Sequence, residues 1–204
     1  MPRKNTQRID QENSYYHVFN RGVNKETIFL DSSDYIVFLS LFKRYLSNQP
    51  AQDVRGHDYI WLQSDIDLLA FCLMPNHFHA FVYQINPGSV SRLFGAVLTA
   101  YGMYFNKKYD RIGPVFQSKY KSKLINQDVY LMHISRYIHL NPKNYQKYDY
   151  SSLPYYLGTK SAEWLRPAAI LDLFSSIPDY EQFLMDYKDY RNSLDTVRTL
   201  LASE

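Results

Sequence analysis

The chain has 204 residues, enough for one domain with a core and an extension, and its net charge of +3 allows a polyanionic partner without requiring one. Its single cysteine, Cys72, excludes a disulfide framework within the chain, and no apolar run approaches the roughly 20 residues of a membrane span. Because the polar, basic start does not resemble a signal peptide, we expect a soluble, cytoplasmic protein with no membrane partner.

The first half of the chain predicts a polar arm, a strand, a helix and a β-hairpin. The helix finds caps in Asp31-Ser32-Ser33-Asp34, and Pro75-Asn76 is a turn-forming pair between two apolar strands. A short strand is expected around Tyr59–Leu62, within the polar stretch that precedes the hairpin. The four main elements are expected over residues 1–13, 15–20, 35–47 and 68–84.

The second half predicts two longer helices, an extended segment between them and a helical tail. Ser89 or Ser91 can cap the first helix and Asp128 the second, which Asn141-Pro142 ends because the residue before proline avoids the helical region. Val115–Ile125 alternates apolar with polar or basic residues, as one extended strand or a bent pair does. The helices are expected up to about residue 108, over 129–140, near 167–175 and over 178–201. The order β-α-β-β-α-β-α predicts an α+β sandwich of ferredoxin-like type, with helices packed on an antiparallel-rich sheet.

Two histidines open the second strand of the hairpin. In a strand, residues i and i+2 point to the same face, so His77 and His79 project together while Phe78 points the other way. Two neutral imidazoles side by side form half of a metal site. The alternative is a pair of histidines that only form hydrogen bonds at a sheet surface.

The helix over 129–140 offers a third ligand. His133, Tyr137 and Asn141 share one face of it, and the amide oxygen of Asn141 lies at the helix end. One amide oxygen with two imidazoles suits Mg²⁺ or Mn²⁺ and leaves positions open for phosphate oxygens. A zinc hydrolase site would instead require a carboxylate, for which this helix has only Asp128.

Tyr137 lies one helical turn before this third ligand and is a candidate nucleophile. A phenol has an unperturbed pKa of about 10 and needs activation, which a divalent cation on the target phosphodiester would assist. Tyr137 is one of 20 tyrosines, so packing in the core is the alternative. Tyr101, Tyr104 and Tyr130 are competing candidates.

Basic residues gather in the middle of the chain and at its start, whereas the stretch from Asp179 leans acidic. This pattern favours a localised phosphate-binding face, although a solvated charged surface would look the same. The 20 tyrosines and 12 phenylalanines either fill the core or stack on bases of single-stranded nucleic acid. The basic residues that could form this face are Arg3, Lys4, Arg8, Arg21, Lys107, Lys108, Arg111, Lys119, Lys121 and Lys123.

Several short motifs occur together in a family-specific order. They are Tyr16-His17-Val18-Phe19-Asn20-Arg21-Gly22 with Ile28-Phe29, Leu73-Met74-Pro75-Asn76-His77-Phe78-His79, Tyr104-Phe105-Asn106, Gly113-Pro114-Val115-Phe116-Gln117-Ser118-Lys119-Tyr120-Lys121-Ser122, Arg136-Tyr137-Ile138-His139-Leu140-Asn141-Pro142 and Tyr150-Ser151-Ser152. In these motifs the chain resembles the REP-associated tyrosine transposases, of the IS200/IS605-like single-tyrosine class. The matching stretches span about residues 15–158.

The resemblance implies a ferredoxin-like HUH-endonuclease fold that cuts single-stranded DNA beside REP-like hairpins and forms a 5′-phosphotyrosine link. His77 and His79 match the metal ligands of that family, Tyr137 the nucleophile and Asn141 the polar ligand. The basic arm of Arg3, Lys4 and Arg8 would order on bases beside the hairpin, while Arg21, Lys107, Lys108, Lys119 and Lys121 would contact the DNA. Many relatives have Arg-Tyr-Lys where this chain has Lys119-Tyr120-Lys121. A lysine at position 119 still attracts phosphate, but it cannot make the bidentate contact that an arginine makes.

These expectations divide the chain into a basic arm (1–13), a nuclease domain (14–158) and a C-terminal helical extension (159–204). They predict a Mg²⁺- or Mn²⁺-dependent enzyme that nicks and transfers single strands, acting as a monomer or homodimer. Two rivals remain open. One is a catalytically silent relative that only binds hairpin DNA or RNA, and the other is a metallohydrolase of small phosphoesters that uses water.

Overall fold

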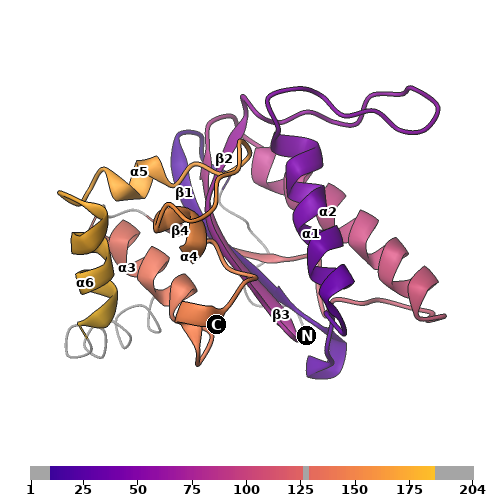
Figure 1. The fold of residues 1–204 in the computed structure, drawn as a ribbon. Coiled ribbons are helices and arrows are strands. Elements are labelled where there is room, and N and C mark those ends of the chain that lie inside the picture. Colours follow the sequence, from indigo (N-terminus) through magenta and orange to yellow (C-terminus); the bar gives the residue numbers. More distant parts are fainter. Residues whose placement is uncertain (1–9, 126–128, 187–204) are drawn as a thin grey trace, which may run out of the picture.

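A four-stranded antiparallel sheet organises residues 10–125 and 129–186, the part of the chain that the computed structural model describes (Figure 1). The strands lie in the order β2-β3-β1-β4. Their bounds are β1 Ser14–Arg21, β2 Ile66–Met74, β3 His77–Gln84 and β4 Lys121–Ile125. Helix α1 (Ser32–Leu46) links β1 to β2, and α2 (Ser89–Lys108) links β3 to β4. This order and these crossovers confirm the predicted ferredoxin-like α+β fold.

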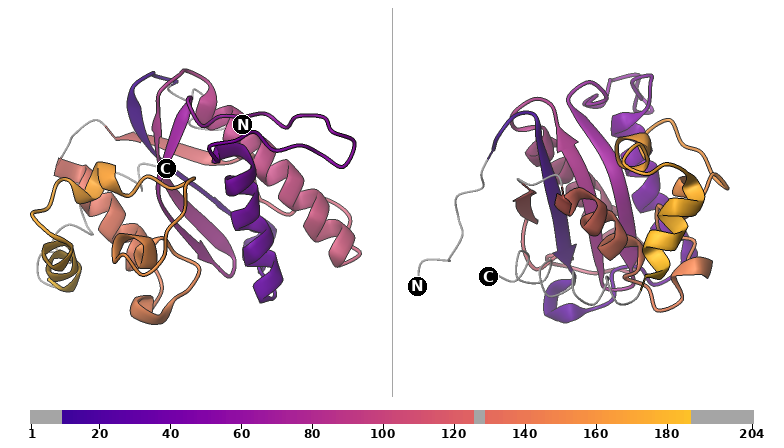
Figure 2. Two further views of the ribbon diagram at one scale, coloured as in Figure 1. Left: turned by 45° about the horizontal axis from the view of Figure 1, so that its top comes forward. Right: turned by 90° about the vertical axis from the view of Figure 1, so that its left-hand side faces the viewer.

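The sheet is covered on both faces, which explains why its central strands are apolar almost throughout. Helices α1 and α2 lie on one side, and α3 (Val129–His139) lies with the C-terminal helices on the other (Figures 1 and 2). Alternate residues of β1 divide between the two layers: Tyr16 and Val18 belong to the core under α1 and α2, whereas Tyr15 packs with the core under α3. One face of β1 and β3 is therefore presented to α3.

The C-terminal segments brace α3 and the edge of β2. Arg136 of α3 is fully buried and donates from Nη1 to the carbonyl oxygen of Phe183, at 3.0 Å. The imidazole of His139 contacts the Tyr180 hydroxyl through Nδ1 at 2.7 Å and the Ser152 hydroxyl through Nε2 at 2.6 Å. The remaining short elements are η1 (Val23–Lys25), η2 (Tyr145–Lys147), α4 (Leu153–Tyr156), α5 (Ala168–Leu171) and α6 (Ile177–Met185). The contacts of Arg136 and His139 hold α3 to α6 and, through Ser152, to Phe71 of β2.

The segment after residue 158 is also part of the core. Trp164 and Leu165 are buried in the cluster under α1 and α2, and the Arg166 amide donates to the carbonyl oxygen of Leu68 in β2. The division into residues 1–13, 14–158 and 159–204 stays a prediction. The described residues contain no helix long and apolar enough to cross a membrane.

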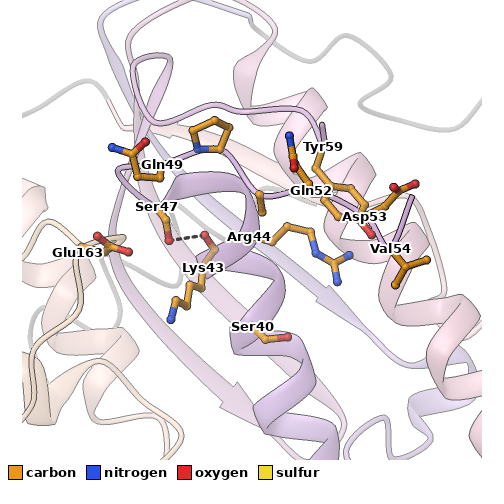
Figure 3. A pocket seen from close by; sticks show the side chains of 12 residues that line it. Ser40, Lys43, Arg44, Ser47, Gln49, Gln52, Asp53, Val54, Tyr59 and Glu163 are labelled. Atoms are coloured by element: carbon orange, nitrogen blue, oxygen red, sulfur yellow. Dashed lines mark hydrogen bonds between the residues drawn. The ribbon is translucent and has the colours of Figure 1, made fainter. Parts of the chain in front are cut away.

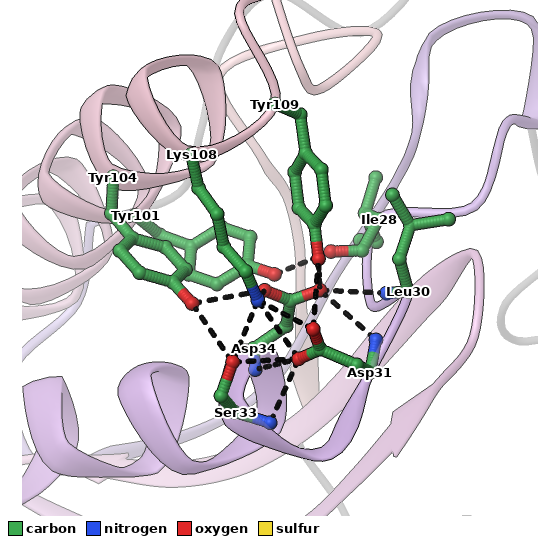
Figure 4. Close-up of polar contacts among 9 residues, drawn as sticks. All are labelled: Ile28, Leu30, Asp31, Ser33, Asp34, Tyr101, Tyr104, Lys108 and Tyr109. Carbon is green, nitrogen blue, oxygen red and sulfur yellow. Dashed lines mark hydrogen bonds and ion pairs between the residues drawn. The ribbon is translucent and has the colours of Figure 1, made fainter.

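A polar cluster joins the start of α1 to the end of α2 (Figure 4). The Asp34 carboxylate, fully buried, accepts hydrogen bonds from the Lys108 ammonium at 2.8 Å, from the Tyr109 hydroxyl at 2.8 Å and from the Tyr104 hydroxyl at 3.0 Å. Lys108 also donates to Asp31, the N-cap of α1, at 2.7 Å. We refer to Asp31, Asp34, Tyr104, Lys108 and Tyr109 as the clasp, because these residues tie the two helices together.

Three local predictions are wrong. Residues 59–62 are not a strand, and the nearest pairing is an isolated bridge between Gln52 and Asp58. Of the segment Val115–Ile125, only β4 is regular, because the Asn20 side-chain amide binds the carbonyl oxygens of Ser118 and Lys119 and diverts the chain before the strand. Helix α2 is preceded by Gly88 rather than by a serine cap, because the Ser89 hydroxyl donates to the Asn86 carbonyl oxygen. Asp128 and the end of the expected helix 178–201 lie outside the described residues.

Candidate functional site

The two predicted histidine ligands lie at the start of β3, on the face presented to α3. Their ring centroids are 5.1 Å apart, with His77 half-buried and His79 only 7% exposed. In the pairing of β3 with β1, His77 lies opposite Arg21 and His79 opposite Phe19. The tight turn at Pro75-Asn76 therefore places both imidazoles on one face, as the hairpin pattern predicted.

Helix α3 brings the two remaining residues to the same place. The His77 Nε2 atom lies 3.3 Å from the Asn141 Oδ1 atom, just beyond the helix end. The Tyr137 ring packs edge-on against the His79 ring, with centroids 5.3 Å apart. The required packing of α3 is present: Tyr137 and Asn141 face the imidazoles of the hairpin. All four residues come from a single chain.

The donor set suits a divalent cation on chemical grounds. The Asn76 amide nitrogen donates to the Lys25 carbonyl oxygen, so its Oδ1 atom faces the ring of His77 and accepts from Nδ1 at 2.7 Å. That leaves a lone pair on His77 Nε2, directed toward another acceptor, the Asn141 oxygen. Two acceptors at 3.3 Å do not bond to each other, but they can share a cation.

The candidate ligand set contains no carboxylate. Within residues 10–125 and 129–186, no three His, Cys, Asp or Glu side chains form a group able to hold a metal ion. The candidate ligands are two imidazoles and one amide. Such a set fits Mg²⁺ or Mn²⁺ when phosphate oxygens and water complete the coordination.

A third histidine, which the sequence analysis did not single out as a site residue, contacts His79 from the neighbouring strand. His17 of β1 is fully buried, and its Nε2 atom lies 3.0 Å from the His79 Nδ1 atom. The signal in the sequence was strand alternation: His17, Phe19 and Arg21 share the face of β1 that borders His77 and His79. To identify His17 as a neighbour of His79 from this alternation, one also needs the register of β1 against β3.

The surroundings keep the imidazoles neutral. Burial lowers the pKa of His79 well below its usual value, and the neighbouring His17, His77 and Arg21 lower it further. Burial also lowers the pKa of His77, with the contact to Asn141 opposing and the charge of Arg21 adding to the shift. Neutral imidazole is the form that binds a metal, so both side chains are ready as ligands at neutral pH.

Acid should destabilise the fold through buried histidines. Burial lowers the pKa of His17 and of His139 to about 3, against about 6.5 in an unfolded chain. Below pH 6.5 the unfolded chain binds protons that the folded chain refuses, so the free energy of unfolding should fall by roughly 1.4 kcal/mol per pH unit for each histidine until pH 3. Urea unfolding at several pH values measures this; a stability that stays flat between pH 7 and 5 would contradict it.

Some predicted DNA contacts lie beside the imidazoles. Arg21 is exposed at the end of β1, and its charge reaches both His77 and His79. Lys121 of β4 lies opposite Phe19, with its Nζ atom 5.9 Å from the centre of that half-buried ring. Lys119 is exposed in the loop that Asn20 holds. These residues border the site from the side of β1 and β4.

The other predicted DNA contacts are not brought to this site. Lys107 is exposed in the last turn of α2, on the opposite side of the sheet. Lys108 belongs to the clasp, where carboxylates offset its charge (Figure 4). We therefore leave Lys108 out of the proposed DNA contacts. Arg3, Lys4 and Arg8 lie outside the described residues.

The competing tyrosines occupy other places. Tyr101 is fully buried and donates to the carbonyl oxygen of Ile28, and Tyr104 belongs to the clasp. Tyr130 packs against the core under α3. Of the four candidates, Tyr137 is the one that contacts His79 and His17, at ring-centroid distances of 5.3 and 6.0 Å.

A pocket of about 510 Å³ lies away from the histidines, where α1 ends (Figure 3). Its lining includes Lys43, Arg44 and Glu163, and the guanidinium of Arg44 stacks over Tyr59 at 4.3 Å. None of the predicted site residues lines it. The candidate site is instead the surface formed by β1, β3 and the end of α3.

Comparison with known proteins finds one family that matches part of the chain. Residues 54–141 match the model of the family described as "Transposase IS200 like". Over these residues the chain is similar to the IS200-like transposases. The matched stretch runs from before β2 to Asn141, so it contains His77, His79, Tyr137 and Asn141.

The fold of most of the chain is similar to that of a solved structure. That structure is described as "Structure of the REP associates tyrosine transposase bound to a REP hairpin". The two share 12% sequence identity with a TM-score of 0.57, over 80% of this chain and 92% of that chain. The likeness supports the ferredoxin-like sheet and its helices. Among curated proteins, none matches the chain.

Proposed function

We propose that this protein nicks single-stranded DNA at hairpin-flanked sites and transfers the strand through a 5′-phosphotyrosine intermediate. The observation that carries the proposal is the convergence of His77, His79, Tyr137 and Asn141 from two separate elements of the fold. The match of residues 54–141 to a transposase family supports it. Tyr137 is then the nucleophile, and the other three residues hold Mg²⁺ or Mn²⁺.

The proposed reaction exchanges one phosphoester for another. The Tyr137 Oη atom attacks the scissile phosphorus, the bond from phosphorus to the 3′ oxygen breaks, and the phosphorus stays on the 5′ end as a phosphotyrosine. The phenol proton passes to solvent, and the departing 3′ oxygen takes one up. His77, His79 and Asn141 would hold the divalent cation, which would supply positive charge to polarise the phosphate. A 3′-hydroxyl can later attack the phosphotyrosine, so rejoining needs no ATP.

Side chains beside the imidazoles could bind the single-stranded DNA on either side of the scissile phosphate. Arg21, Lys119 and Lys121 offer phosphate contacts, and Phe19 offers a ring on which a base can stack. The N-terminal residues Arg3, Lys4 and Arg8 would extend these contacts toward a hairpin. That the similar solved protein is bound to a REP hairpin supports hairpin DNA as the partner.

One chain is enough to complete the proposed site. His77 and His79 lie on the sheet, Tyr137 lies on α3, and Asn141 lies just beyond the end of that helix, which the same chain braces through Arg136 and His139. We therefore propose that a monomer is competent, while a homodimer remains compatible. The cytoplasm is the expected location.

The test is to trap the covalent intermediate. The full-length protein is incubated with hairpin oligonucleotides that carry single-stranded flanks, in Mg²⁺, in Mn²⁺ or in EDTA. With the label on the 3′ end of the oligonucleotide, we expect a labelled protein that survives denaturing electrophoresis. With the label on the 5′ end, we expect a shorter free strand that ends in a 3′-hydroxyl. EDTA should abolish both products.

Other outcomes separate the rivals. Hairpin binding with no adduct, across a panel of stems and flanks and with both metals, would identify a silent binding protein. A labelled protein from the 5′-labelled strand would mean that the tyrosine holds the 3′ end instead. Cleavage without any adduct would indicate a hydrolase that uses water.

A further inference from the structure

His17 and His79 are joined edge to edge rather than stacked face to face. Their ring planes differ by only 13°, and their centroids are 5.0 Å apart. The His17 Nε2 and His79 Nδ1 atoms are 3.0 Å apart. Facing rings would have their planes in contact at a shorter centroid distance, so this geometry describes one in-plane hydrogen bond between two imidazoles.

We propose that His17 is a positioning residue that sets the tautomer of His79 and so turns the His79 Nε2 atom into the ligand nitrogen. This rests on the proposed function only in taking His79 as a metal ligand. The His79 Nδ1 atom is occupied by the contact with His17, so Nε2 is the nitrogen left for a cation. Nε2 has a lone pair only if the proton of His79 sits on Nδ1 and is donated to His17.

The proton count shows what this arrangement demands. Two neutral imidazoles carry two protons on four nitrogens, and one proton lies in the bond between the rings. If His79 is the donor, its Nε2 is bare and the proton of His17 must sit on Nδ1. If His17 is the donor, the proton of His79 sits on Nε2 and blocks a metal there. Binding therefore selects one of two neutral tautomeric pairs without changing their total charge.

The two candidate ligands differ in how firmly this selection is made. The amide of Asn76 presets His77, because its own nitrogen is bound to the Lys25 carbonyl oxygen. For His79 the partner is another imidazole, which can donate or accept. Moreover, the buried His17 Nδ1 atom finds no hydrogen-bond partner among the described residues. The tautomeric pair that binds the metal places an N–H group on this nitrogen without an acceptor, which costs free energy, so His17 determines how readily His79 presents a bare Nε2 atom.

Metal affinity in an inactive background tests the proposal. In full-length protein carrying Tyr137→Phe, Mn²⁺ binding is measured by calorimetry and by electron paramagnetic resonance. His17→Phe keeps a ring but removes the acceptor, and we expect it to weaken Mn²⁺ binding by about 10- to 100-fold. His17→Gln restores an acceptor oxygen and should recover part of the loss. His57→Phe alters an exposed histidine outside the site and should bind as the parent does.

A second readout does not depend on the variants. Nitrogen-15 NMR of the Mg²⁺-loaded Tyr137→Phe protein assigns the tautomers, and we expect His79 and His17 both to carry their proton on Nδ1. If His17→Phe fails to fold, His17→Gln and this spectrum decide. Mn²⁺ binding by His17→Phe at parental affinity, or a metal-loaded His79 protonated on Nε2, overturns the proposal while leaving the nicking function intact. A parent protein that binds no Mn²⁺ and a wild type that forms no adduct overturn both.

Discussion

Tyr137→Phe should abolish the covalent protein–DNA adduct while leaving the fold and metal binding unchanged. Phenylalanine keeps the ring that packs against His79 and removes only the oxygen that would attack phosphorus. With no other nucleophile at that position, strand cleavage should fall by at least about 1,000-fold. The measurement is adduct yield on a 3′-labelled hairpin oligonucleotide in Mg²⁺ or Mn²⁺, with thermal unfolding as a check on folding.

Tyr130→Phe is the matched control for this change. It removes a phenol from the same helix, but from a side chain that packs in the core under α3. We expect it to retain adduct formation. If Tyr137→Phe still cleaves DNA while His77→Ala does not, water is the nucleophile and the metallohydrolase reading is correct. If both tyrosine variants form the adduct, the nucleophile lies elsewhere in the chain.

Among the aspartate variants considered, Asp34→Ala should lower the free energy of unfolding most, by about 3–5 kcal/mol. The Asp34 carboxylate is fully buried and accepts from Lys108, Tyr104 and Tyr109 (Figure 4). It also accepts from the backbone amide of Leu30 at 2.7 Å. Removing it leaves the Leu30 amide without its acceptor and opens a space beside the Lys108 ammonium and the two tyrosine hydroxyls, which keep only their weaker or more exposed partners, Asp31 and Ser33. Urea unfolding at pH 7 gives the difference from wild type.

Two other aspartates calibrate that result. Asp58→Ala removes an exposed carboxylate and should change the free energy of unfolding by less than about 0.5 kcal/mol. Asp31→Ala removes the N-cap of α1, whose side chain accepts from the Ser33 and Asp34 amides, and should cost about 1 kcal/mol. A loss below 1 kcal/mol for Asp34→Ala would mean that water replaces the carboxylate easily and that the clasp contributes little.

The parts of the fold and site that depend on local pattern were predictable. The hairpin turn at Pro75-Asn76 and strand alternation placed His77 and His79 on one face, and helical spacing placed Tyr137 and Asn141 together. Each of these inferences uses neighbours within a few residues in the sequence. That the two pairs meet follows from the packing of α3 on the sheet, which local pattern could state only as a requirement.

What the pattern missed depends on long-range contacts. Lys108 looked like any basic residue of the middle segment, and its carboxylate partners are more than 70 residues away. His17 is a site neighbour only through the register of β1 against β3. The irregular stretch before β4 arises because the amide of Asn20, in another strand, binds its carbonyl groups. Side-chain contacts between residues that are far apart in the sequence produce no periodic pattern from which they could be predicted.

The bracing of α3 by Arg136 and His139 has a consequence for strand exchange. Tyr137 lies on a helix that Phe183, Tyr180 and Ser152 hold in place, so we expect it to move little relative to the sheet. On the proposed mechanism, a strand attached to Tyr137 would stay beside the sheet, and the incoming 3′ end would have to move to it for rejoining. The choice of which ends are joined would then depend on the length and flexibility of the DNA between the hairpin and the nick.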